Sequence, residues 1–204
     1  MNKKYQEDIA HIHSMMERSS RFISLSGISG IFAGLIALAA AGLACYFLNK
    51  NGLDYFEGRR SAYPDELLIE LFLTGIIALI AALACGIFFT VSKSRKNKMP
   101  IWNGLTKRLL LSLFIPLIAG GIFCIALFYN GQLAFVAPAT LIFYGLALIN
   151  AGKYTFSDIV YLGYCELALG LAAMFFSNYG LLFWAAGFGL LHIIYGLLMH
   201  KKYH

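Results

Sequence analysis

The chain has 204 residues, of which 60% are hydrophobic and only 13% are charged. A soluble domain usually carries about 25% charged and about 45–50% apolar residues, so a soluble core of this size could not hide the apolar excess. The net charge is +6, but the sequence lacks a basic face with interleaved aromatic residues, so we expect no nucleic-acid partner. The apolar residues fall in long blocks separated by short polar stretches, which is typical of membrane-spanning helices.

The first polar segment, residues 1–21, is predicted to form an amphipathic helix at the membrane interface. Ile9, Ile12 and Met16 share one face by helical spacing, and charged side chains occupy other positions. The alternative is that this segment extends the first transmembrane helix on its cytoplasmic side.

Six apolar blocks follow, and each is long enough to cross a bilayer as a helix. Pro64, Asp65 and Glu66 indicate the start of the second span, because proline and acidic residues are favoured in the first turn of a helix. We therefore expect an all-α fold, a polytopic bundle of six transmembrane helices that forms one domain, residues 22–204. The spans are predicted at about residues 22–47, 67–91, 109–129, 133–151, 158–176 and 181–199.

The basic residues predict how the helices are oriented. With a cytoplasmic N-terminus, 13 of the 16 Lys and Arg residues lie on the cytoplasmic side, and only Lys50, Arg59 and Arg60 lie outside. Short loops rich in Lys and Arg stay preferentially in the cytoplasm. The predicted topology is therefore multi-pass, with both termini cytoplasmic.

The first span begins with a series of small residues at four-residue spacing, Ser26, Gly30 and Gly34. Such residues let two helix backbones approach closely. The series predicts helix packing within the chain, and a homo-oligomer interface is the alternative. A second pattern is an internal echo, because Tyr144-Gly145-Leu146 and Tyr195-Gly196-Leu197 each end a predicted hairpin. Either the two hairpins are duplicated or the echo is a chance similarity in apolar sequence.

The most basic stretch follows the second span and contains Lys93, Arg95, Lys96 and Lys98. These side chains are candidates for binding anionic lipid headgroups, at about 1 kcal/mol per residue. The alternative is that they serve only as the topology signal described above.

Glu166 is the acidic residue that lies well inside a predicted span, where a charge costs at least about 2.5–3.5 kcal/mol. It lies eight residues beyond Asp158, and His192 lies eight residues before His200 on the neighbouring antiparallel span. Tyr144 falls near the same depth. We therefore expect Glu166, His192 and Tyr144 to form one polar cluster. The cluster is either a clamp that holds helices together or a proton-responsive or substrate-binding site in the inner half of the membrane.

Known catalytic and metal-binding patterns give little support for an enzyme. Gly27-Ile28-Ser29-Gly30 resembles the motif around the serine of rhomboid proteases, which also have six spans and a later histidine. Here the serine lies in the first span, and nothing in the sequence requires it to meet His192. The four cysteines are isolated in separate blocks, so we expect packing roles, no metal and no cofactor.

The stretches Glu17-Arg18-Ser19-Ser20-Arg21-Phe22 and Gly187-Phe188-Gly189-Leu190-Leu191-His192 resemble those of poorly characterised small bacterial membrane proteins with six spans. The resemblance implies a bacterial inner membrane and no known activity. Two functions therefore remain open. The first is a structural or regulatory protein that acts through a protein or lipid partner, and the alternative is a small transporter or proton-coupled sensor built on Glu166 and His192.

Overall fold

The computed structural model describes residues 27–53, 63–96 and 101–203, and this part of the chain is all-helical. The predicted interfacial helix, Ser26 and Lys98 lie outside the described residues. Three short 3-10 turns, η1 (Leu133–Phe135), η2 (Gly152–Tyr154) and η3 (Ser177–Tyr179), connect longer elements. The longer elements are α2 (Gly27–Lys50), α3 (Asp65–Lys96), α4 (Gly104–Tyr129), α5 (Val136–Ala151), α6 (Asp158–Phe175), α7 (Gly180–Trp184), η4 (Ala185–Leu191) and α8 (His192–Tyr203).

Six helical stretches in this described part are long and apolar enough to cross a membrane, which confirms the predicted number of candidate spans. The second stretch is longer than predicted, because α3 begins at Asp65 and continues through the basic residues to Lys96. The sixth stretch runs from Gly180 to Lys202 but is not one regular helix. Its central part, η4, is a π-helix between two α-helical segments.

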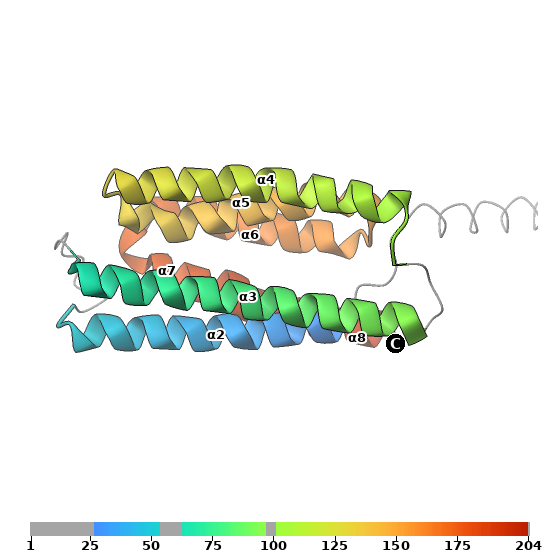
Figure 1. Ribbon diagram of the computed structural model, residues 1–204, viewed down its shortest axis with the longest axis horizontal. Coiled ribbons are helices and arrows are strands. Elements are labelled where there is room, and N and C mark those ends of the chain that lie inside the picture. Colours follow the sequence, from blue (N-terminus) through green and yellow to red (C-terminus); the bar gives the residue numbers. More distant parts are fainter. Residues whose placement is uncertain (1–26, 54–62, 97–100, 204) are drawn as a thin grey trace, which may run out of the picture.

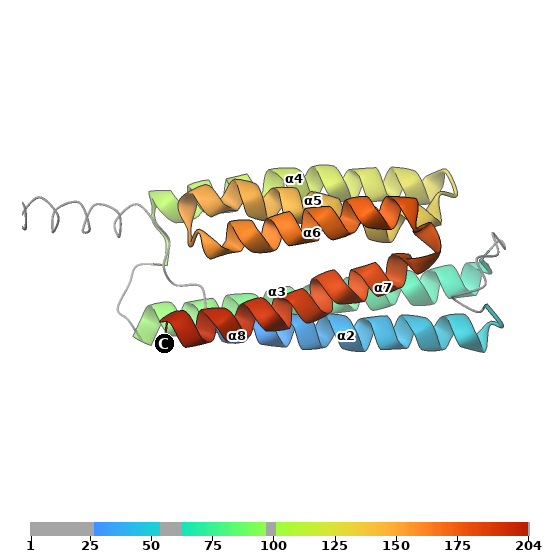
Figure 2. The same cartoon turned by 180° about the vertical axis from the view of Figure 1, so that it is seen from behind.

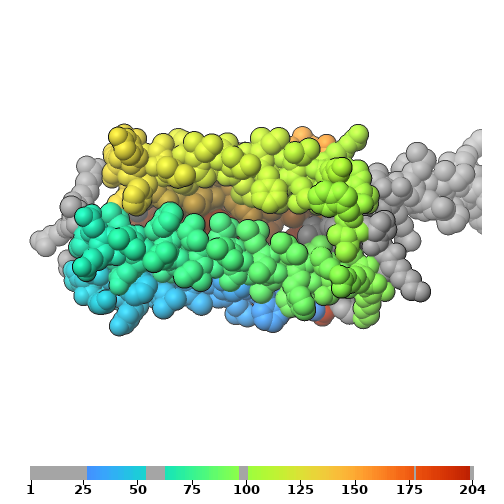
Figure 3. Space-filling view, viewed as in Figure 1, coloured from blue at the N-terminus to red at the C-terminus, as the bar shows by residue number. Residues whose placement is uncertain are grey.

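The helices form two layers of three, as Figures 1 and 2 show from opposite sides. In one layer α2 lies between α3 and the last helix, and in the other α5 lies between α4 and α6. The layers meet mainly where α5 and α6 contact α7 and η4. On the opposite face, α3 and α4 form separate ridges with a furrow between them (Figure 3). The two layers are therefore joined along one side.

Two of the helix pairs are packed through glycines in the same register. In the α5–α6 pair, a Cβ on Gly145 would lie 2.7 Å from the backbone oxygen of Gly163. In the α8–α2 pair, a Cβ on Gly196 would lie 2.6 Å from the backbone oxygen of Gly27. Close approach of this kind requires residues without a side chain.

The correspondence between these pairs extends along both helices. Ile142 lies against Gly170 in the first pair, as Ile193 lies against Gly34 in the second. Ile142 precedes Gly145 by the same interval that separates Ile193 from Gly196. The echo in the sequence therefore coincides with two helices, α5 and α8, that pack on their partners in the same way.

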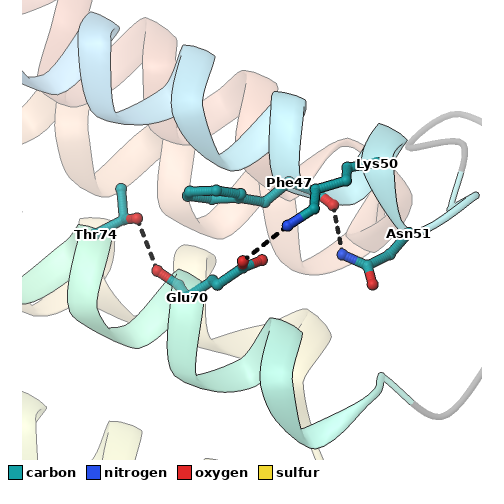
Figure 4. Close-up of polar contacts among 5 residues, drawn as sticks. All are labelled: Phe47, Lys50, Asn51, Glu70 and Thr74. Carbon is teal, nitrogen blue, oxygen red and sulfur yellow. Dashed lines mark hydrogen bonds and ion pairs between the residues drawn. The ribbon is translucent and has the colours of Figure 1, made fainter.

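Polar contacts hold the end of the α2–α3 hairpin (Figure 4). Lys50 Nζ lies 3.3 Å from Glu70 Oε1, and Asn51 Nδ2 donates to the backbone oxygen of Phe47 at 2.9 Å. Thr74 Oγ1 donates to the backbone oxygen of Glu70 at 2.7 Å, which is the bond a helical threonine commonly makes. Gly52 makes the turn beyond α2 with a φ of 69°, a conformation that favours glycine.

Candidate functional site

Three side chains from three helices meet at the junction of the two layers. Tyr144 lies on α5, Glu166 on α6 and His192 at the start of α8. The Tyr144 hydroxyl lies 2.8 Å from His192 Nε2, and His192 Nδ1 lies 3.3 Å from Glu166 Oε1. The structure thus brings together the three residues that were expected to form one cluster. Their functional role stays a prediction.

Two members of the cluster are buried, and Tyr144 is half-buried. Glu166 has a relative exposure of 0% and His192 of 6%. Among the described residues, neither carboxyl oxygen of Glu166 has a hydrogen-bond partner with good geometry, so its contact with His192 is an ion-pair distance only. Burying a charged group is costly without a partner of opposite charge, and the nearest such group is the imidazole. Glu166 and His192 therefore depend on each other energetically.

The hydrogen-bond partners of His192 assign the positions of its protons. Nδ1 lies 3.1 Å from the backbone oxygen of Gly187, and a carbonyl oxygen can only accept. Nδ1 therefore carries a hydrogen. In a neutral imidazole Nε2 is then the acceptor for the Tyr144 hydroxyl. With a neutral imidazole the hydrogen bonds run from Tyr144 through His192 to the carbonyl of Gly187. With a protonated imidazole, the state that forms an ion pair with Glu166, both ring nitrogens donate and the Tyr144 hydroxyl accepts.

The π-helix η4 places the backbone of Gly187 against this cluster. A Cβ on Gly187 would clash with Glu166 Oε2 and with a terminal carbon of Leu141. Any larger residue at this position would therefore displace the Glu166 carboxyl group or the end of Leu141. A π-helical segment changes the order of side chains around a helix and is frequently found at functional sites. Here it ends at His192.

Two aromatic residues extend the cluster, and the sequence analysis did not include them. The Phe188 ring centroid lies 5.0 Å from that of Tyr144 and 5.9 Å from that of His192. Trp184 continues the row, 5.1 Å from Phe188. Trp184, Phe188 and His192 recur every four residues, so helical spacing from the buried histidine would have found them. Tyr144 and Phe188 thus lie against the imidazole, and Trp184 lies beyond Phe188.

A second polar contact joins the same two helices near one end of the bundle. Lys202 Nζ on α8 lies 2.8 Å from Asp158 Oδ1 at the start of α6. The antiparallel helices α6 and α8 are thus tied at two levels, by Lys202 and Asp158 at the end and by His192 and Glu166 inside. Exposed pairs contribute at most about 1 kcal/mol, so the inner pair is the more sensitive one.

No protein-family model matches this chain, and neither the curated proteins nor the solved structures include one that is significantly similar to it. The function must therefore be argued from the chain's own geometry.

The other residues singled out in the sequence lie apart from one another. Gly30 and Gly34 pack against the last helix, so in this structure they serve packing within the chain. Lys93, Arg95 and Lys96 form the final turn of α3. None of the four cysteines forms a disulfide, and the described ranges contain no group of three His, Cys, Asp or Glu side chains that could hold a metal.

Proposed function

We propose that this chain is a multi-pass membrane protein with a structural or regulatory role, in which Tyr144, His192 and Glu166 clamp the two helix layers together. The observation that supports this proposal is the complete burial of Glu166 between α6 and η4, within ion-pair distance of His192. A buried, mutually dependent pair fixes one arrangement of its helices, because any other arrangement leaves a charge without a partner. In this proposal the protein is not an enzyme and acts through a protein or lipid partner.

The clamp lies at the one side where the layers touch, which favours a role in holding their relative position. Interhelical hydrogen bonds in membrane proteins contribute about 0.6 kcal/mol on average and up to about 1.7 kcal/mol. Replacing the His192 side chain breaks its hydrogen bond to Tyr144 and also leaves Glu166 without its ion-pair partner. We therefore expect His192→Ala to lower the free energy of unfolding by about 2–4 kcal/mol.

The second candidate is a small transporter or proton-coupled sensor that uses Glu166 and His192. One observation favours it: the carboxyl group lacks a well-formed hydrogen bond among the described residues, although it lies inside a span. Ionisable residues within membrane spans commonly mark proton or ion pathways. Beside the imidazole and against Gly187 of the π-helix, Glu166 would accept a proton and release the constraint on α8.

Two variants separate the two candidates. Glu166→Gln keeps the shape of the side chain but cannot ionise, and the double variant Glu166→Leu with His192→Phe replaces the polar pair by apolar groups. If the pair is a clamp, the double variant folds with a stability close to that of the parent protein, because apolar packing can replace a buried ion pair. It should also complement a strain that lacks the parent protein.

The proton-coupled candidate makes the opposite prediction for Glu166→Gln. In liposomes containing a pH-sensitive dye, the parent protein would dissipate an imposed pH gradient, and Glu166→Gln would not. The matched control is Glu70→Gln, which removes an acid from the exposed end of α3. Gradient dissipation that depends on Glu166 and not on Glu70 would contradict the clamp proposal.

We further propose that the protein resides in a bacterial inner membrane with both termini in the cytoplasm. The supporting observations are the six apolar helices and the positions of the basic residues, which gather at one end of the predicted spans. Reporter domains fused to the C-terminus and to the turn at Gly131 test the orientation. A periplasmic C-terminus would contradict it.

A further inference from the structure

A shallow groove runs along one face of α3 near its basic end. It is an open depression of about 450 Å³, and the described residues that line it all lie on α3. The residues that line it recur at intervals of three and four, so they form a single stripe on the helix. Among the described residues these are Ala84, Ile87, Phe88, Val91, Ser92 and Arg95.

The chemistry of this groove changes along its length. From Ala84 to Val91 its wall is apolar, and at the end of the helix it carries the Ser92 hydroxyl and the Arg95 guanidinium. The rise from Ala84 to Arg95 is about 16 Å at about 1.5 Å per residue. This length is close to half of a hydrocarbon core of about 30 Å, that is, to the depth of one leaflet. The groove therefore has the length and polarity of one leaflet of lipid.

We propose that this groove binds one anionic phospholipid, in the membrane leaflet that contains the basic end of α3. The phosphate lies at Arg95 and Ser92, and an acyl chain lies along Ala84, Ile87 and Val91. An arginine guanidinium can bind two phosphate oxygens at once, and a serine hydroxyl can donate to another. Much of the remaining surface of α3 is apolar and exposed, and the stripe that lines the groove is the part of it that ends in the Ser92 hydroxyl and the Arg95 guanidinium.

The inference is independent of the clamp, because the groove residues lie on α3, which does not contribute to the cluster. It also separates the roles of neighbouring basic residues. Arg95 lines the groove, whereas Lys96, the next residue, is exposed and does not line it. Both carry one positive charge at the same end of the helix. Lys96 is therefore a matched control for a general surface charge.

Native mass spectrometry of the full chain in detergent measures the binding directly. The probes are dioleoyl phosphatidylglycerol, which is anionic, and dioleoyl phosphatidylcholine, which has the same chains and no net charge. We expect Arg95→Gln to lower the affinity for the anionic lipid about fivefold, the equivalent of about 1 kcal/mol. Lys96→Gln should lower it less than twofold. Ala84→Phe, which fills the apolar wall, should weaken the binding of both lipids.

Each alternative outcome overturns the proposal. Equal losses of lipid affinity in Arg95→Gln and Lys96→Gln would mean that the charge of the whole segment attracts the lipid. The groove would then have no specific role. Equal affinity of the parent protein for both lipids would remove the role of Arg95. Unchanged binding in Ala84→Phe would remove the role of the apolar wall. Because Arg95 and Lys96 are exposed, both variants should keep the melting temperature of the parent protein.

Discussion

Substitution of Gly145 by alanine tests the close packing between α5 and α6. The added Cβ would lie 2.7 Å from both the Gly163 oxygen and the Leu167 nitrogen, which are backbone atoms and cannot rotate away. The two helices would have to separate by about 0.7 Å to restore an ordinary contact, and overpacking of this kind costs about 1–3 kcal/mol. Alanine also stabilises a helix interior by about 1 kcal/mol relative to glycine, which opposes this cost.

The matched control for this substitution is Gly121→Ala in α4. Gly121 also lies inside a helix, but a Cβ there would meet no atom within 4 Å. The gain in helix propensity is the same in both variants, so it cancels in the comparison. The difference in unfolding free energy between Gly145→Ala and Gly121→Ala is therefore the packing term alone, about 1–3 kcal/mol. Gly196→Ala should resemble Gly145→Ala, because Gly196 occupies the same register against α2.

The assay is reversible unfolding of the purified protein in mixed micelles of a mild detergent and SDS, followed by far-UV circular dichroism. The order of stability should be Gly121→Ala first, then the parent protein, then Gly145→Ala and Gly196→Ala. Equal stability of Gly145→Ala and Gly121→Ala would refute the close approach of α5 and α6. A large loss in Gly145→Ala with none in Gly196→Ala would refute the shared register of the two helix pairs.

Three further substitutions have expected outcomes in the same unfolding assay. Asn103→Ala removes the helix cap of α4, in which the Asn103 side chain accepts from the Thr106 backbone nitrogen at 2.8 Å, and should cost about 0.5–2 kcal/mol. Tyr144→Phe removes only the hydroxyl bonded to His192 and should cost about 0.6–1.7 kcal/mol, with no change if that bond does not form. Asp158→Asn breaks an exposed ion pair and should cost less than about 1 kcal/mol, with a smaller effect at 1 M salt. An Asp158→Asn effect that does not depend on salt would contradict the electrostatic explanation.

The shared register of the α5–α6 and α8–α2 pairs also explains a limit of sequence analysis. The sequence contains the two Tyr-Gly-Leu triplets, and they suggest duplicated hairpins of consecutive helices. In the structure Gly196 of the second triplet packs on α2, the first described helix, and Gly145 of the first triplet packs on α6, so neither glycine packs on its partner in the predicted hairpin. The two triplets identify similar helices. They do not show whether the glycine of each helix packs on a helix that is close or distant in the sequence.

The sequence by itself determined how many apolar helices there are, roughly where they lie along the chain, and the common depth of Glu166, His192 and Tyr144. These properties depend on length and composition along one dimension, since a helix rises by a constant amount per residue. Hydropathy gave no information on how the helices rotate, because the surface that faces lipid and the surface that faces another helix are both apolar.

Only the tertiary structure decided how the helices are layered: α2 lies between α3 and the last helix, α5 lies between α4 and α6, and α3 and α4 remain apart. It also placed the π-helix beside Glu166, where Gly187 gives the carboxyl group its space. No pattern of apolar residues predicts a π-helix, because one extra residue per turn is stabilised by the contacts of neighbouring helices and not by local composition. The cluster could be predicted because its residues are polar in apolar surroundings, whereas its supporting rings and glycines look like any other part of a membrane helix.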